Sequence, residues 1–343
     1  MLSLLQSIFG PPSRTGGRPD EALIERATER VVDGTDARLR AVIGYRKKLR
    51  PAVERAVDYV IDLADTLPPP LEFSRSQYGT DPRLRAFFAS PERLQQVVST
   101  SPAIRDFAAR GQRPATDVIY AGLGTEREEH KVLGMDLAGE TLRRDVEQVV
   151  VNFCNHRFVA VTDDETATRW ELKKRAFDSL IEMALRRLVT ERTKRDALAR
   201  ERHLLENKLQ ALAAGQWGLE SVLDSVPSAP TDTAAIETRI AGIDAELARI
   251  GATTVNLDDY LELVVDTLST PQQHLRREAV SLTLSRMGIK LAAGSKNAGD
   301  TLELSEFSRA DGRRAIVVLV CIPWSELPER ASDFFAEASR YLG

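Results

Sequence analysis

The feature that most constrains the fold is a run of helical periodicity between about residues 162 and 214. Positions spaced alternately by four and three residues form one face of a helix over this whole stretch. Eight of these eleven positions are apolar, and the three polar ones cluster in residues 191–202. The positions are Phe177, Ile181, Ala184, Leu188, Glu191, Arg195, Leu198, Arg202, Leu205, Leu209 and Leu212. We therefore predict one long helix, capped by Thr162 or Asp163 and ended by Gly215.

A second stretch, Ile236–Ile250, repeats the same spacing after a loop that contains Pro227 and Pro230. It matches Leu198–Leu212 in length, and matched apolar seams joined by a loop are typical of an antiparallel coiled-coil hairpin. At a rise of 1.5 Å per residue, the predicted arm is about 25 Å long. We expect Glu191, Arg195 and Arg202 to face solvent or another chain where the arm leaves the body.

The first third of the chain indicates compact helical packing. A helix is predicted from Asp20, and another from Asp36 toward Thr66, with Pro51 either kinking it or opening a new helix. Three short helices follow, each predicted from a capping side chain that precedes a proline at the first helical position. These pairs are Asp81-Pro82, Ser90-Pro91 and Ser101-Pro102.

Two stretches indicate antiparallel strands. In the first, we predict separate strands around residues 118–123, 131–137, 146–153 and 158–161, with a turn at Asn155-His156. In the second, strands are predicted at 280–291, 302–304 and 316–322, the last two joined at Asp311-Gly312. A helix is predicted after them, from about Phe334 to Tyr341. We favour one sheet shared by both stretches over two small domains.

The predicted class is therefore α+β and mainly helical, with a helical region, antiparallel β meanders and an inserted coiled-coil hairpin. The predicted divisions are an apolar segment and linker at 1–19, a helical region at 20–112, a β meander at 113–162, the long helix and arm at 163–252, and a C-terminal region at 253–343.

Composition restricts the location and the class of partner. The 343 residues carry a net charge of −4, which gives no overall attraction to nucleic acid or anionic lipid. There are two cysteines, no stretch resembles a signal peptide, and no apolar run reaches the roughly 18 residues of a membrane span. We expect a cytoplasmic protein. Residues 1–9 are apolar and are expected to dock on the body, with a partner or a membrane surface as alternatives.

No pattern predicts catalysis, a cofactor or a metal. Cys154 and His156 would share a strand face, but zinc usually takes three or four protein ligands, so we predict no metal site. Gly122-Leu-Gly124 is followed by strand-like residues, which favours a β-turn over a phosphate-binding loop. We expect a chain that is not an enzyme, although an enzyme without a recognisable signature stays the third hypothesis.

The loop of the predicted hairpin is the sharpest candidate site. It holds five large apolar residues far from the predicted body, and a cluster led by tryptophan is typical of a protein contact. These residues are Trp217, Leu219, Val222, Leu223 and Val226. The alternative is that they fold back and cap the end of the hairpin. Our first hypothesis is an interaction or assembly protein that binds a protein partner here and that also self-associates through sheet edges or the polar seam region.

Basic side chains give the second hypothesis, a factor associated with nucleic acid. They cluster on two predicted helical faces, at 38–50 and 173–195, and lysine and arginine clusters are typical of phosphate contacts. The candidate residues are Arg46, Lys47, Lys48, Arg50, Lys173, Lys174 and Arg175. Acidic neighbours at helical spacing favour a solvated face instead, so this hypothesis ranks below a protein partner.

Overall fold

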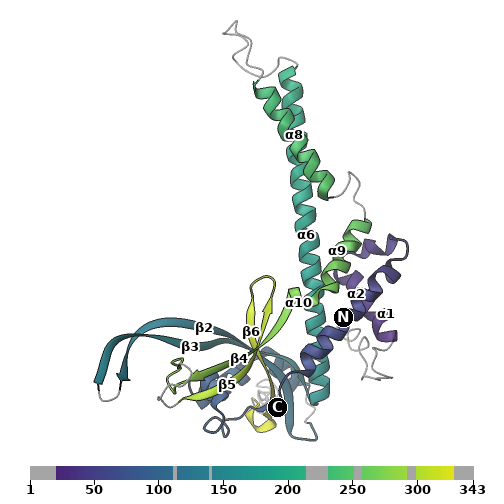
Figure 1. The fold of residues 1–343 in the computed structure, drawn as a ribbon. Helices are drawn as coiled ribbons and strands as arrows, with labels where there is room; N and C mark the ends of the chain where they lie inside the picture. Colours follow the sequence, from purple (N-terminus) through teal and green to yellow (C-terminus); the bar gives the residue numbers. More distant parts are fainter. Residues whose placement is uncertain are drawn as a thin grey trace, which may run out of the picture. The chain divides into compact units, whose positions relative to one another are not determined.

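The computed structural model describes residues 21–110, 114–138, 141–213, 231–250, 257–291 and 299–327 (Figure 1). These residues form two compact units. We call the first the sheet unit (residues 56–179 and 271–327) and the second the helical unit (residues 21–55 and 180–270). The sheet is six-stranded and the helices are numerous, which confirms the α+β, mainly helical class.

The helical unit is built from six elements, two of which, α2 and α6, also supply residues to the sheet unit. They are α1 (Glu21–Gly34), η1 (Ala37–Ala41), α2 (Tyr45–Asp65), α6 (Glu165–Ala213), α8 (Thr231–Ile250) and α9 (Leu257–Ser269). The helix predicted from Asp20 is confirmed as α1. The stretch predicted as one helix from Asp36 is divided into η1 and α2, and Pro51 lies inside α2 without ending it.

The core of the helical unit lies between α1, α6 and α9. Ala27, Val31, Ala184 and Val264 are each fully buried. Gly34 marks a close approach between helices, because a Cβ there would lie 2.5 Å from the Cγ2 atom of Ile181.

The predicted long helix is confirmed as α6, with 49 residues. Its first turn is capped by Asp164, whose Oδ2 accepts a 2.8 Å hydrogen bond from the backbone N–H of Ala167. The cap is therefore one residue later than Asp163, the later of the two predicted positions. A carboxylate at this position satisfies a free N–H and complements the helix dipole.

Within the helical unit, α8 lies along the C-terminal half of α6 (Figure 1). Ion pairs join Lys194 to Glu246 at 2.8 Å, Glu201 to Arg239 at 2.6 Å and Arg202 to Asp244 at 2.7 Å. Residue numbers rise along α6 as they fall along α8, so the two helices are antiparallel.

These ion pairs also indicate which parts of the two helices lie together. Leu198 lies between Lys194 and Arg202, whose partners on α8 are Glu246 and Asp244, and Ile243 beside them is fully buried. Arg202, expected to face solvent or another chain, has a side chain that is 38% exposed and that also forms an ion pair with α8.

The sheet unit contains one six-stranded sheet with the order β3-β2-β6-β5-β4, and β1 pairs with β6 in parallel. All other ladders are antiparallel. The strands are β1 (Leu71–Glu72), β2 (Val118–Ala138), β3 (Thr141–Thr162), β4 (Leu275–Leu284), β5 (Asp300–Arg309) and β6 (Arg314–Pro323). The expectation of one shared sheet is therefore confirmed, and β2·β6 is the ladder that joins the two stretches.

Two bridges continue the ladder beyond β4. Leu284 pairs with Lys290, and Ile289 pairs with Val150 of β3. Backbone hydrogen bonds support the second bridge, from Val151 N–H to Gly288 O and from Lys290 N–H to Val149 O, both at 2.8 Å. The sheet therefore curls until its two edge strands meet through the turn at residues 285–290.

Three short helices cover this curled sheet. They are α3 (Pro82–Phe87), α4 (Pro91–Thr100) and α5 (Pro102–Ala109), and each has the predicted capping residue and N-terminal proline. The short α10 (Pro271–His274) precedes β4, and η2 (Trp324–Glu326) follows β6. Phe73 lies at the centre of the core, fully buried, with edge-on contacts to Phe88 at 5.3 Å and Phe158 at 5.4 Å between ring centroids.

The strand predictions in the first β stretch are partly wrong. Residues 118–137, predicted as two strands, form the single strand β2, and the Gly122-Leu-Gly124 turn lies inside it. Gly122 serves packing instead, because a Cβ there would lie 2.8 Å from Leu172 of α6. The predicted Asn155-His156 turn likewise lies inside β3.

Bulges explain why turn-like residues occur within β3. The register shifts near Asp145, Asn155 and Ala160, and each of these residues has a φ between 54° and 57°. Asparagine and aspartate adopt this left-handed backbone more readily than most residues, which suits a bulge as well as a turn. The extra residue at Asn155 also allows Phe153 and Phe158, five positions apart, to enter the same core.

Candidate functional site

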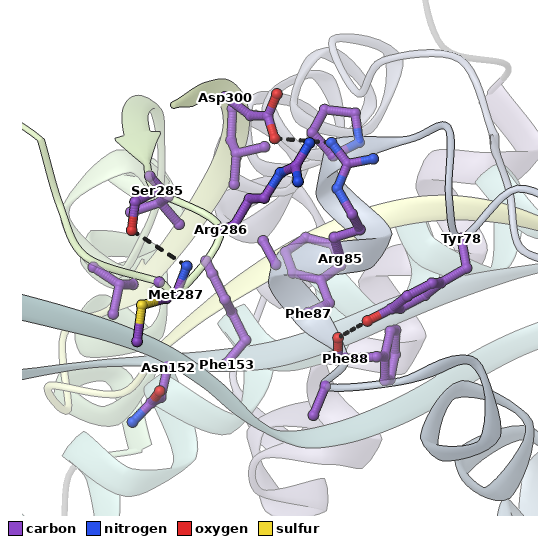
Figure 2. A pocket seen from close by; sticks show the side chains of 17 residues that line it. Tyr78, Arg85, Phe87, Phe88, Asn152, Phe153, Ser285, Arg286, Met287 and Asp300 are labelled. Carbon is purple, nitrogen blue, oxygen red and sulfur yellow. Dashed lines mark hydrogen bonds and ion pairs between the residues drawn. The ribbon is translucent and has the colours of Figure 1, made fainter. Parts of the chain in front are cut away.

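A pocket of about 620 Å³ opens in the sheet unit between α3, β3 and the turn at residues 285–288 (Figure 2). Figure 2 shows Arg85 and Arg286 on the side of the pocket where Asp300 lies. Arg85 donates to Asp300 Oδ2 at 2.8 Å and to the backbone oxygen of Gly79 at 2.6 Å. Tyr78 donates to the backbone oxygen of Phe88 at 3.0 Å, which ties the loop before α3 to its end.

A second pocket of about 810 Å³ lies on the other side of Phe87 and Phe153. These two rings meet edge-on with centroids 4.9 Å apart, and they line both pockets together with Ala89. We call these two neighbouring pockets together the β3 groove. Seven consecutive residues of β3, Phe153–Val159, line its larger half, and α4 and the start of α5 form the opposite wall.

The edge of β3 is accessible along this groove. In a regular strand, alternate residues face opposite sides, so a pocket over one face would be lined by every second residue. Lining by consecutive residues instead indicates that the strand's edge and bulge border the pocket. One edge of β3 pairs with β2 along its length. In the described ladders, the opposite edge has a strand neighbour only at Val149–Val151, so the backbone groups on that edge beyond Val151 have no ladder partner.

The groove is lined by more positive than negative charge. Four arginines and one carboxylate line it, and the carboxylate, Asp300, is paired with Arg85. Arg93, Arg157 and Arg286 are exposed, and none has a carboxylate partner within the described ranges. Arg93 does donate to Gln96 Oε1 at 2.7 Å.

His156 is the titratable group most perturbed by the groove. Its ring stacks on Phe88 with centroids 4.5 Å apart, and its Nε2 atom is buried without a hydrogen-bond partner among the described residues. Desolvation by burial lowers the pKa of His156 from 6.5 to about 4, against the opposing effect of a hydrogen bond with the Phe87 backbone. The ring is therefore neutral at pH 7 and can both donate and accept hydrogen bonds.

Cys154, the other residue of the predicted Cys/His pair, does not carry a reactive thiol. Burial and the neighbouring Glu128 raise the pKa of Cys154, which disfavours the nucleophilic thiolate. Its Sγ donates to the backbone oxygen of Glu126 at 3.7 Å. In the part of the chain that the structure describes, three or more His, Cys, Asp or Glu side chains nowhere gather as metal ligands.

The basic residues of the nucleic-acid hypothesis are largely paired with carboxylates. Those on α2 pair as Arg46 with Glu29, Lys48 with Asp258, and Arg50 with both Glu21 and Glu54. On α6, Lys173 pairs with Asp65 at 2.7 Å and lies over the Trp170 ring, and Lys174 pairs with Glu171 at 2.5 Å. Lys47 and Arg175 are exposed, and no carboxylate partner is found for either in the described ranges.

The predicted partner-binding residues of the hairpin loop lie outside the described residues. These are Trp217, Leu219, Val222, Leu223 and Val226. The apolar segment at 1–9 and the helix predicted at Phe334–Tyr341 also lie outside them. The structure describes the residues on either side of this loop, which are the end of α6 at Ala213 and the start of α8 at Thr231.

Sequence reasoning missed the β3 groove. Its walls come from three separate stretches, residues 78–103, 151–159 and 284–302, which are brought together only by the curled sheet. One local signal existed: Asn155 interrupts a strand pattern without a second turn residue, which is compatible with a bulge.

None of the helices within the described ranges is both long and apolar enough to cross a membrane. Comparison of the chain with protein-family models, with curated proteins and with solved structures finds no match.

Proposed function

We propose that this chain is a non-enzymatic interaction or assembly protein, in which α6 and α8 form a coiled-coil arm that holds a protein partner. The observation that carries the proposal is the antiparallel pairing of α6 with α8 through three ion pairs around the buried Ile243. A helical pair of this kind projects its connecting loop, and residues 214–230 of that loop contain the apolar cluster predicted from the sequence.

The pairing of basic residues with carboxylates favours this proposal over a nucleic-acid factor. A lysine or arginine that already pairs with a carboxylate must lose that contact, or share it, before it can neutralise a phosphate. Five of the seven candidate residues have such a partner. The body of the protein then supports the arm, and self-association remains part of the proposal.

The arm can be tested by separating α6 from α8 without altering the loop. Ile243→Asp places a carboxylate where the side chain is fully buried, which should detach α8. Ile43→Asp is the matched control, because Ile43 is 94% exposed and lies in the same unit. A photo-reactive amino acid at position 217, expressed in the native cells, reports the partner by cross-linking.

The proposal predicts one discrete cross-linked protein for the parent chain and for Ile43→Asp, and its loss in Ile243→Asp. Cross-linking that is equally strong from a control position such as Arg105, or that yields only nucleic acid, would count against it. Trp217→Ala should weaken capture and leave the melting temperature nearly unchanged. A fall of several degrees would instead favour the alternative in which Trp217 caps the hairpin.

A further inference from the structure

The β3 groove carries positive charge that is not matched by carboxylates within the described residues. Several exposed basic residues outside the groove pair with carboxylates, as Arg46, Lys48 and Arg50 do. In the groove, three of the four arginines do not. We propose that the β3 groove binds an extended acidic peptide segment of a partner protein that carries an apolar anchor residue.

The shape of the groove favours an extended occupant. Its two halves, of about 620 and 810 Å³, lie next to each other and share the rings of Phe87 and Phe153 as lining. A compact small molecule would fill one half, whereas an extended chain can occupy both. Apolar side chains supply the floor, among them Val97, Phe158 and Val159, so the groove also has a place for an apolar anchor.

The chemistry of the rim sets the charge of the occupant. Arg93 and Arg157 flank the larger half, and Arg286 borders the smaller half. Guanidinium groups without a partner bind carboxylates with paired hydrogen bonds, which are stronger than hydrogen bonds between neutral groups. An occupant with aspartate or glutamate on either side of its anchor would supply the missing carboxylates.

The groove also offers hydrogen bonds to a peptide backbone. The β3 edge beyond Val151 has no ladder partner in the described structure. The N–H and C=O groups of an extended peptide can pair with such an edge. The bulge at Asn155 limits how regular such pairing can be, so side-chain contacts with the arginines are expected to contribute most of the selectivity.

A nucleic acid fits the same groove less well. Single strands without sequence preference are held by bases that stack on exposed aromatic rings. The rings here are covered: Phe87, Phe153 and Phe158 are 3%, 8% and 5% exposed. The groove therefore has the positive charge of a nucleic-acid site without its stacking surface.

The test measures binding of a labelled peptide library, in which acidic and apolar residues alternate, to the full-length chain by fluorescence anisotropy. A second library has lysine in place of every acidic residue, and a single-stranded oligonucleotide is a third probe. Members of the acidic library should bind, and the lysine library should not. Hydrogen exchange should slow in residues 152–159 when an acidic peptide is bound.

Variants then locate the binding site. Arg93→Gln combined with Arg157→Gln should weaken binding by about tenfold, which corresponds to the loss of one charge-assisted contact. Arg276→Gln combined with Arg313→Gln removes the same charge from exposed residues outside the groove and should change binding by less than about twofold. Circular dichroism and thermal melts confirm that both double variants fold.

Four outcomes would overturn the proposal. They are no binding by any acidic peptide, equal binding of the lysine library, equal weakening by the two double variants, and tighter binding of the oligonucleotide that the groove variants abolish. In a fifth outcome, peptide binding is lost only at higher protein concentrations, where the chain self-associates. This result would assign the groove to a second copy of the chain and would also overturn the proposal. None of these measurements involves the α6–α8 pair, so the result is independent of the proposed arm.

Discussion

The α6–α8 pair and the core of the sheet unit are held together in different ways. Within the described residues, the pair has three cross-helix ion pairs between side chains that are 33–55% exposed, and three buried apolar side chains, Leu198, Ile236 and Ile243. The sheet unit buries a cluster of apolar residues from three helices and six strands, including the fully buried Phe73. Exposed ion pairs contribute about 0–1 kcal/mol each, whereas a buried aromatic side chain contributes several.

Because of this difference, the two regions should open in different ways. A pair of helices with little buried surface is expected to open locally, without unfolding the chain. A shared core such as that of the sheet unit is expected to unfold cooperatively. Three predictions test this contrast, and they follow in decreasing order of the effect that we expect.

Phe73→Ala should have the largest effect. It removes a ring in edge-on contact with Phe88 and Phe158 and leaves a cavity in the core, for a loss of about 3–5 kcal/mol in the free energy of unfolding. Chemical denaturation followed by circular dichroism measures it. Hydrogen exchange should rise across the whole sheet unit. A rise confined to residues near Phe73 would show that this core is not cooperative.

His156 should make the sheet unit sensitive to acid. Its pKa is about 4 in the folded protein and about 6.5 when unfolded, so between these values the unfolded state binds the proton first. Stability is therefore fully present above pH 6.5 and falls as the pH decreases toward 4. The loss should be about 1–2 kcal/mol after allowance for the solvent access of the ring.

The check is the melting temperature at pH 7 and at pH 4.5. His156→Phe keeps a ring beside Phe88 but cannot be protonated, so part of the acid sensitivity should disappear. His203→Gln, an exposed position on α6 in the helical unit, should keep the sensitivity of the parent chain. An unchanged pH dependence in His156→Phe would contradict the assignment.

The Lys194–Glu246 ion pair should have the smallest effect. A double-mutant cycle with Lys194→Ala and Glu246→Ala should give a coupling free energy of about 0.2–1 kcal/mol, which decreases in high salt. Hydrogen exchange of residues 231–250 measures it. Coupling well above this range would mean that charge, more than Ile243, holds α8 to α6.

Local signals in the sequence predicted the helices well. The three proline-led caps depend only on neighbouring residues: Asp81, Ser90 and Ser101 each accept a hydrogen bond from an N–H two or three positions later. The extent of α6 followed from its apolar periodicity. Its register against α8 did not, because the seam repeats every seven residues and a shift of one heptad preserves the apolar matching.

The sheet was harder to predict because its features depend on distant partners. Gly122 has the signature of a turn, but its role comes from Leu172 of α6, fifty positions away along the chain. The groove depends on the bridge between Val150 and Ile289, which no local pattern encodes. Even so, Asp311-Gly312 predicted its hairpin correctly, because the required backbone is local and Gly312 has a φ of 86°.

The bulge at Asn155 has a consequence for changes in chain length. It resets the alternation of β3, so that residues on either side of it keep their buried and exposed roles. Without this single residue, β3 would pair regularly with β2 at this point: Gly124 would still lie opposite Arg157, and Phe153 and Phe158, then four positions apart, would still face the same core. A deletion of one residue should therefore be tolerated better at Asn155, where it removes the bulge, than at a regularly paired position of β3, where it would turn the following side chains to the other face.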